Sequence, residues 1–469
     1  MPVNKMKFKK YTPEQYEMVD WMQENDGILL VEAGPGTGKS FMSREVTEVL
    51  APKTCLYTAF NKAIVEEGVA RFRGLNVVCK TMHALAWAFV RPKKINDISY
   101  KCITEKITYQ QKARVIDAID RFYLSASTDM YEFMEEFFTE KHELKLIDIS
   151  VKYIEKMIAK EIDPTFSFLL KYFHLCLLDG SATCEYDLVI LDEINDTTAV
   201  VLEIFKLINA PKKLGLGETN QAIYDFMHLV NGFEVLADEA TILPLTQSFR
   251  CSENIAKKIQ QFMRNDVNQN FKFIGTDEPV RNGKFLYCTA TNGMIIKAIH
   301  EALQDGNGFH LLRKISEIFA YPMDIATAGR GKKVYHRKHA FLEDEYHEYE
   351  KIKRKGYSWL AHLLECVADQ ETKTAVNLML SLNRKNVNLF DLYNQAKNAD
   401  VDLDYTIATV FTAKGLEFET VHIADDLNSR IKKIRDEGGI QNHDDLVAFR
   451  CYYVAVSRCG VDLINATSL

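Results

Sequence analysis

A glycine-rich loop has the residue types and spacing that phosphate binding requires. It consists of Ala33, Gly34, Pro35, Gly36, Thr37, Gly38, Lys39 and Ser40. Its glycines let backbone amides close on phosphate oxygens without a Cβ in the way. Lys39 would reach the β- and γ-phosphates of ATP, and the Ser40 hydroxyl would bind Mg²⁺. The loop therefore predicts a nucleotide-binding site.

Two carboxylates farther along the chain complete this chemistry. Asp192 and Glu193 end a predicted buried strand at 186–193 whose apolar core is 188–191. Asp192 would bind the Mg²⁺ that bridges the phosphates, and Glu193 would polarise the attacking water. Gln221 follows another apolar run, and its amide can contact both a γ-phosphate and water. An acidic turn is common in isolation, but the phosphate loop upstream favours the catalytic interpretation.

The flanking sequence supplies elements that would hold these groups. An apolar run at 28–31 precedes the loop and a helical pattern at 41–50 follows it, so strand, turn and helix occur in the required order. Thr12 is a plausible cap of an earlier helix that carries Gln15. The carboxamide of Gln15 can donate to and accept from an adenine edge, although a solvent-facing helix residue is the alternative.

Several polar and aromatic residues are expected where strands end. Phe60 and Asn61 end a predicted strand at 55–62, and Thr81 and His83 end one at 76–84. Tyr224 and Phe226 follow Gln221 within one turn. Ligands gather at the carboxyl ends of parallel strands, and aromatic rings stack on bases, so these residues predict a single-stranded nucleic-acid track. The alternatives are capped turns and core aromatics.

The second half of the chain contains further candidates. Phe249 is a candidate adenine platform, and Arg250 a candidate clamp for transition-state charge. Glu417 could hold a ribose hydroxyl, and Arg458 ends a predicted helix. A second sheet is predicted from strand patterns at 284–288, 308–313, 323–328, 405–410 and 461–465.

Composition sets the broad class of the protein. The chain of 469 residues is too long for one ordinary core, so roughly two to four domains are expected. Ten cysteines without a C-x-x-C pair favour reduced thiols and a cytoplasmic, intracellular location. Neither a signal peptide nor a long apolar run is visible, so no membrane association is expected. A net charge of −7 does not exclude a local basic channel for nucleic acid.

Taken together, these stretches resemble superfamily 1A DNA helicases of the UvrD and Rep type, in the family's order from Gln15 to Arg458. The sequence D-E-I-N-D-T at 192–197 is similar to the family's D-E-x-Q-D-T, and T-A-K-G-L-E-F at 412–418 and Y-V-A-V-S-R at 453–458 are nearly verbatim. Within the superfamily the likeness is closer to the F-box DNA helicase subgroup. No segment resembles an F-box, so only the helicase core is expected.

The resemblance implies an α/β fold: two RecA-like parallel-sheet domains, each with a helical insertion, and ATP between them. The boundaries expected are 1–92 and 180–245 for domain 1A, 93–179 for helical insertion 1B, 246–340 and 401–469 for domain 2A, and 341–400 for a reduced insertion 2B. The resemblance also implies 3′→5′ movement on single-stranded DNA. Single-strand/duplex junctions and replication or recombination proteins are the partners expected, in DNA repair, replication or recombination.

The resemblance assigns nucleotide-site roles to Lys39, Ser40, Asp192, Glu193, Gln221, Arg250, Arg458, Gln15, Phe249 and Glu417. Three positions depart from the family: Asn195 replaces a glutamine, Met227 an arginine and Phe411 a histidine. The first departure affects the expected coupling between the phosphate and the DNA. The other two affect the expected contacts along the DNA track. An ATPase that strips proteins from DNA, a nucleotide-gated binding module and an RNA-specific enzyme are alternative functions.

Overall fold

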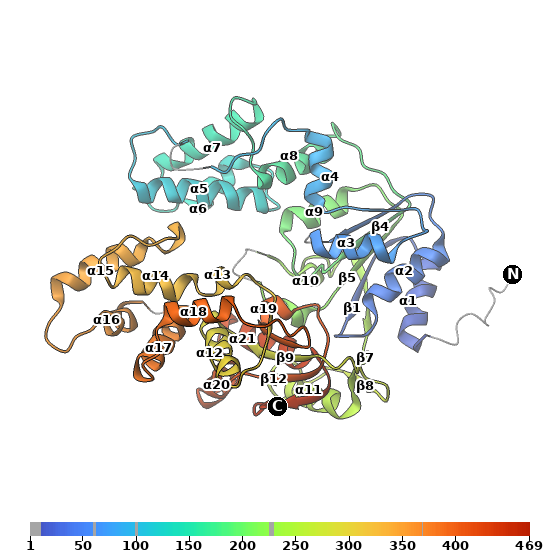
Figure 1. Cartoon of the computed structure of the whole chain (residues 1–469). Helices are drawn as coiled ribbons and strands as arrows, with labels where there is room; N and C mark the ends of the chain where they lie inside the picture. Colours follow the sequence, from blue (N-terminus) through green and yellow to red (C-terminus); the bar gives the residue numbers. More distant parts are fainter. Residues whose placement is uncertain (1–10, 60–61, 99–101, 225–228, 368) are drawn as a thin grey trace. The chain divides into compact units, whose positions relative to one another are not determined.

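The computed structural model describes residues 11–59, 62–98, 102–224, 229–367 and 369–469 (Figure 1). The chain divides into two compact units, Met1–Thr246 and Gln247–Leu469. Each unit contains an all-parallel main sheet flanked by helices. The α/β class with RecA-like parallel sheets is therefore confirmed. No helix within the described ranges is long and apolar enough to cross a bilayer.

The first unit is built on a six-stranded sheet with the order β3-β2-β4-β5-β1-β6. Its strands are β1 (Gly27–Ala33), β2 (Cys55–Ala59), β3 (Val77–Cys79), β4 (Leu188–Asp192), β5 (Lys212–Gly217) and β6 (Ala240–Leu245). All neighbouring strands are parallel. The central strands β2 and β4 are buried along their whole length, as their mainly apolar sequences predict.

Side chains that alternate along these strands fill a core on each face of the sheet. Leu29 and Val31 pack on the side of α1 (Pro13–Glu24) and α2 (Lys39–Leu50). Leu30 packs on the opposite side, with α4 (Met82–Val90) and α9 (Ala199–Leu207). The period of two along a strand places neighbouring residues on opposite faces.

Between α4 and β4, the described residues form four further helices (Figure 1). They are α5 (Tyr109–Leu124), α6 (Met130–Phe137), α7 (Lys145–Ile158) and α8 (Phe166–Leu178). Their buried side chains, such as Phe122 and Leu169, belong to the same hydrophobic cluster as Val189 and Leu191 of β4. These helices therefore share one continuous core with the sheet. Short elements complete the unit: α3 (Lys62–Arg71), the 3₁₀ helix η1 (Thr219–Gln221) and α10 (Gly232–Val235).

The second unit is built on a five-stranded parallel sheet with the order β10-β11-β9-β12-β13. Its strands are β9 (Phe285–Thr289), β10 (His310–Leu311), β11 (Tyr405–Thr409), β12 (Phe418–Ile423) and β13 (Cys459–Ile464). A separate parallel pair is formed by β7 (Gln247–Ser252) and β8 (Ile274–Thr276).

Helices make up most of the remainder of the second unit. They are α11 (Glu253–Asp266), α12 (Asn292–Gln304), α13 (Ile315–Ile318), α14 (Ala320–Ala328), η3 (Arg337–His339), α15 (Phe341–Ile352), α16 (Trp359–Cys366), α17 (Gln370–Arg384), α18 (Leu389–Lys397), α19 (Val410–Ala413), α20 (Asp425–Asp436) and α21 (His443–Val456).

The strand predicted at 323–328 is wrong, because this segment lies in α14. Tyr321, Ile325 and Ala328 bury one helical face against Leu342 and Trp359. Their spacing of four and three residues fits the helical period, so packing on the neighbouring helices determined the structure here.

Candidate functional site

The glycine-rich loop connects β1 to the first residue of α2, Lys39. Gly36 and Gly38 have φ angles of 70° and 87°, in the left-handed region that a residue without a Cβ adopts readily. The N–H of Gly34 donates to the carbonyl at the end of β6, at 3.0 Å, and the Thr37 hydroxyl donates to the Gly34 carbonyl at 2.8 Å. The loop is therefore held by its neighbours in a fixed turn, with a helix N-terminus directly behind it.

Gln15 ties the first helix to this loop. As predicted, Thr12 caps α1, and the side chains and backbones of Thr12 and Gln15 form a reciprocal capping box. The buried Gln15 Nε2 also donates to the Thr37 carbonyl at 3.1 Å. A carboxamide has two N–H donors and two acceptor lone pairs, so these bonds leave one of each for a further contact.

Lys39 and Glu193 come together although they follow different strands. The Lys39 Nζ lies 3.5 Å from Glu193 Oε1. Lys39 follows β1 and Glu193 follows β4, and β5 runs between these strands in the sheet. Glu193 has a φ of 57°, which costs energy in a residue with a Cβ. The strained turn directs the carboxylate toward the phosphate loop.

Asp192 occupies a buried site with two partners that the sequence analysis did not identify. The Tyr57 hydroxyl donates to Asp192 Oδ2 at 2.6 Å, and the nearest guanidinium nitrogen of Arg71 lies 3.6 Å from the same oxygen. Burial, followed by the Glu193 carboxylate, raises the pKa of Asp192. Tyr57 could have been noticed only because it lies in a strand predicted to be buried. A buried phenol hydroxyl needs a hydrogen-bond partner.

The residues proposed to hold Mg²⁺ have suitable chemistry. Mg²⁺ prefers oxygen ligands, and the Asp192 carboxylate and the hydroxyl of the exposed Ser40 are both hard oxygen donors. The raised pKa of Asp192 shows that its surroundings disfavour an isolated negative charge. A nearby cation would offset that penalty.

Gln221 belongs to a second buried group at the end of β5. Its Nε2 hydrogen-bonds to Glu218 Oε2, and the Glu218 N–H donates to Asn195 Oδ1 at 2.9 Å. A Cβ at Gly217 would lie 2.4 Å from the same Asn195 oxygen, so glycine is required there. Asn195, which stands where the helicase family has glutamine, therefore connects the turn after β4 to the turn after β5. Glu218 was missed because its link to Asn195 joins two different turns, which the local sequence does not show.

The second unit brings Arg250, Glu417 and Arg458 around Ser457. Arg250 Nη2 lies 2.8 Å from Glu417 Oε1, and its Nη1 donates to the Ser457 carbonyl at 3.0 Å. Arg458 is almost completely buried and donates from Nη2 to the Ser457 hydroxyl at 3.2 Å. Phe249, adjacent to Arg250, is exposed. Three side chains that are far apart in the sequence thus form one group, which includes the carboxylate predicted to bind ribose.

Two of the predicted nucleic-acid residues, Thr81 and His83, lie after β3 and not within the predicted strand. The strand predicted at 76–84 ends at Cys79, and Thr81 is the N-cap of α4, where its hydroxyl accepts the Ala84 N–H at 3.1 Å. The prediction differs because the apolar segment 82–90 forms a helix, for which Thr81 is a suitable N-cap. His83 lies on the first turn of α4, and burial lowers its pKa.

An aromatic cluster extends from His83 along the surface of the first unit. The ring centroid of Phe166, in α8, lies 6.1 Å from that of His83 and 6.0 Å from that of Trp87. Phe166 is 54% exposed and Trp87 is 39% exposed. Trp87 could have been found from its spacing of four residues from His83 on one helix, whereas Phe166 has no local sequence signal.

The other predicted nucleic-acid residues are only partly covered. Tyr224 is half-buried just after η1. Phe60, Asn61 and Phe226 lie outside the described residues, as does Met227, and their assignments stay predictions.

The parallel sheets and the phosphate loop between β1 and α2 place the chain in the class of P-loop proteins with RecA-like domains. Residues 15–227 match the family described as AAA domain. The chain is 25% identical, over 98% of its length and 49% of the relative, to F-box DNA helicase 1 of Gallus gallus. It is 24% identical, over 62% of its length and 36% of the relative, to F-box DNA helicase protein 1 of Schizosaccharomyces pombe.

A third similar protein is the mitochondrial ATP-dependent DNA helicase HMI1 of Saccharomyces cerevisiae, at 22% identity over 57% of this chain and 43% of the relative. The chain thus spans about half the length of the curated relatives it matches, or less. These matches confirm the resemblance drawn from the motifs: the chain is related to the UvrD/Rep-like helicases and is similar to the F-box DNA helicases.

Proposed function

We propose that this chain is an ATP-dependent DNA helicase or translocase that moves 3′→5′ along single-stranded DNA. The observation that carries the proposal is the Lys39–Glu193 pair, because it joins a phosphate-loop lysine to a carboxylate placed to orient water. The names of the similar proteins, all DNA helicases, supply the substrate class. A protein that only binds nucleotide does not need this pair.

In this proposal each group has a separate task. Lys39 compensates charge on the β- and γ-phosphates, and Glu193 polarises the attacking water. Ser40 and Asp192 would hold Mg²⁺, which neutralises phosphate charge when it is bound. Gln221 contacts the γ-phosphate. Its hydrogen bond to Glu218, and that of Glu218 to Asn195, connect a movement of Gln221 to the turn after β4. Arg250 and Arg458 stabilise transition-state charge, and Gln15, Phe249 and Glu417 contact the nucleoside.

On the nucleic-acid side, the exposed Trp87 and Phe166 are suited to stacking on bases beside His83. Phe60, Asn61, Thr81, Tyr224 and Phe226 remain the other proposed contacts. Stacking tolerates any sequence, since every base has a π-face. This property fits a protein that moves along a strand.

One set of assays tests the proposal. ATP hydrolysis is measured with no polymer, single-stranded DNA, duplex DNA and single-stranded RNA, beside unwinding of duplexes with a 3′ or a 5′ tail. We expect stimulation by single-stranded DNA and unwinding only from a 3′ tail, with Glu193→Gln inactive in both assays. Stimulation without unwinding would favour a protein-stripping translocase. Stimulation by RNA alone would contradict the DNA assignment, and no turnover under any condition would favour a binding module.

A further inference from the structure

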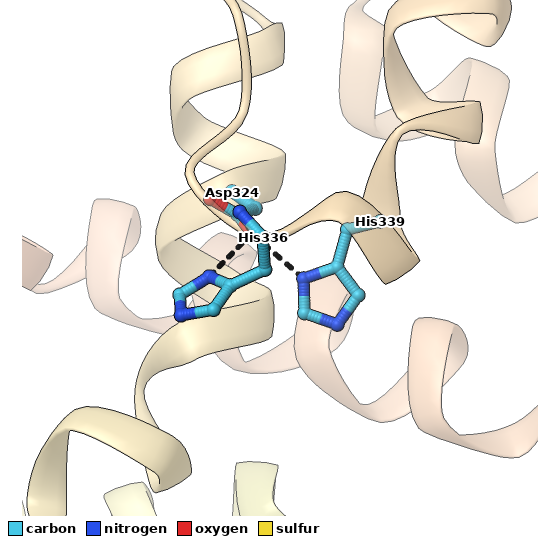
Figure 2. A group of neighbouring side chains, drawn as sticks. All are labelled: Asp324, His336 and His339. Carbon is cyan, nitrogen blue, oxygen red and sulfur yellow. Dashed lines mark hydrogen bonds and ion pairs between the residues drawn. The ribbon is translucent and has the colours of Figure 1, made fainter. Parts of the chain in front are cut away.

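A buried carboxylate in the second unit receives two histidine side chains from a neighbouring loop. Asp324 lies in α14 with its side chain completely buried. His336 and His339 belong to the segment that links α14 to α15. Figure 2 shows both imidazole rings turned toward this carboxylate. The Nδ1 atoms lie 2.8 and 2.7 Å from the same oxygen, Oδ2.

Hydrogen bonding alone leaves this oxygen crowded. Asp324 Oδ2 also accepts the backbone N–H of His336 at 3.2 Å, so three donors converge on one atom. A carboxylate oxygen has two lone pairs. The other oxygen, Oδ1, accepts the Tyr335 N–H at 2.9 Å. A cation in place of the two imidazole protons would relieve this crowding, because each Nδ1 would then present a lone pair instead of a proton.

The three side chains have the ligand chemistry of a transition-metal site. One ligand atom from each lies within 4.8 Å of those of the other two. Zn²⁺ binds histidine nitrogen and carboxylate oxygen at about 2.0–2.2 Å, which places tetrahedral ligands about 3.3 Å apart. The nitrogen–oxygen distances of 2.8 and 2.7 Å therefore need to open by only about half an ångström. The His336 side chain is 46% exposed, so it is free to move outward and leaves an entry path.

We propose that Asp324, His336 and His339 form a zinc site with three protein ligands and a fourth position open to solvent. Two contacts that position the ligands are already in place. The Tyr335 N–H fixes the orientation of the carboxylate. The Tyr321 ring, 4.7 Å from that of His339, supports the buried imidazole.

A second group, Glu345, His362 and Cys366, also has one ligand atom from each residue within 4.8 Å of the others, but its contacts use opposite sides of one imidazole ring. Glu345 Oε2 faces His362 Nε2 at 3.2 Å, whereas Cys366 Sγ faces Nδ1, on the other side of the ring, at 3.6 Å. One imidazole cannot present both nitrogens to one ion. This second group therefore serves as a control.

The zinc ion would fasten a basic loop to α14. The exposed cationic residues of that loop are Arg330, Lys332, Lys333, Arg337 and Lys338. Without the ion, the link between this loop and Asp324 rests on hydrogen bonds to one carboxylate. With the ion, coordination bonds at both histidines would hold the loop in one conformation.

The test uses the full chain, stripped of metal with a chelator, and titrates it with Co²⁺ and with Zn²⁺ in competition with a chromophoric chelator. We expect about one equivalent to bind, with the visible spectrum of tetrahedral Co²⁺. His336→Ala and His339→Ala should each weaken binding by roughly tenfold or more. His347→Ala, an exposed histidine on α15, and Cys366→Ser, which removes the thiol of the second group, should bind like the wild type.

Thermal unfolding with and without Zn²⁺ separates the metal site from a hydrogen-bonded cluster. Zn²⁺ should raise the melting temperature of the wild type and of His347→Ala, but not that of His336→Ala. His336 is half exposed, so this variant should fold even if His339→Ala does not. Equal Zn²⁺ uptake by the wild type and His336→Ala, or loss of uptake in Cys366→Ser, would overturn the proposal.

Discussion

The Nζ of Lys39 lies 3.5 Å from Oε1 of Glu193, and this ion pair joins the turns after two strands that are not neighbours in the sheet. The carboxylate therefore lies beside the group that would bind the γ-phosphate. Water held by Glu193 would be oriented relative to the same phosphate. Because the two residues have different tasks, we expect their substitutions to have different effects.

Lys39→Ala should abolish ATP turnover and leave the fold intact. The substitution removes the charge that compensates the β- and γ-phosphates. Phosphate release and the melting temperature check this expectation. The control is Lys62→Ala, because Lys62 is exposed and pairs only with Glu66 one helical turn away among the ion pairs of the described residues. Near-normal hydrolysis by folded Lys39→Ala protein would refute the phosphate-loop assignment.

Glu193→Gln should still bind ATP but hydrolyse it about two to four decades more slowly. The amide keeps the size of the side chain but cannot act as a base. Nucleotide binding and single-turnover hydrolysis are measured on the same preparation, with Glu185→Gln, on the surface of the first unit, as the control. A change of less than roughly threefold would mean that another residue positions the water.

Arg458→Ala should lower turnover much more than ATP affinity, since a charge clamp acts mainly in the transition state. The side chain is buried and donates to the Val454 carbonyl and the Ser457 hydroxyl, so the alanine variant should also unfold at a lower temperature. Arg458→Lys retains the charge and limits that effect. If both variants lose affinity and turnover equally, Arg458 is a binding residue.

Trp87→Ala should weaken binding of single-stranded DNA by about tenfold and leave basal ATP hydrolysis unchanged. The physical reason is that one aromatic ring stacked on a base contributes about 1–3 kcal/mol. Fluorescence anisotropy with labelled DNA measures the affinity. Tyr131→Ala, which removes an exposed aromatic side chain of α6, is the control. Unchanged affinity would exclude the aromatic cluster from the DNA track, and a destabilised protein that loses both activities would show that Trp87 is structural.

The stability of the protein should depend on pH through Lys171 of α8. Burial lowers the pKa of Lys171 to about 7, and its Nζ donates to the Ser125 and Ser127 carbonyls. The unfolded lysine has a pKa of about 10.4, so between these values the unfolded state binds more protons. The contribution of Lys171 to the free energy of unfolding therefore rises with pH in this window, by at most about 1.4 kcal/mol per pH unit.

Urea unfolding of the wild type and Lys171→Met at several pH values between 7 and 10 measures this contribution as a difference. The wild type should gain stability relative to Lys171→Met as pH rises. The control Lys141→Met replaces an exposed lysine of the same unit and should follow the wild type. Parallel curves for the wild type and Lys171→Met would contradict the lowered pKa.

Local sequence predicted the parts of the site that lie within one turn. The phosphate loop, the Thr12 cap and the acidic pair after β4 are each encoded by a few adjacent residues, and their elements form as expected. The partners of Asp192 could not be predicted in this way, because Tyr57 precedes it by 135 residues and only the strand order brings them together. The strand predicted at 323–328 failed for the same reason: its helical packing partners lie elsewhere in the chain.

The core that α5, α7 and α8 share with β4 and α9 also determines how the first unit unfolds. Deleting residues 93–179 would expose the apolar faces of α4 and α9, on which α5 and α8 pack, so the shortened protein should aggregate instead of retaining a functional nucleotide site. Amide protons of α8 and β4 should exchange together, as members of one cooperative foldon. Natural variation in length should therefore be confined to the loops between these helices, because a change in their buried faces would disturb the strand that ends at Asp192.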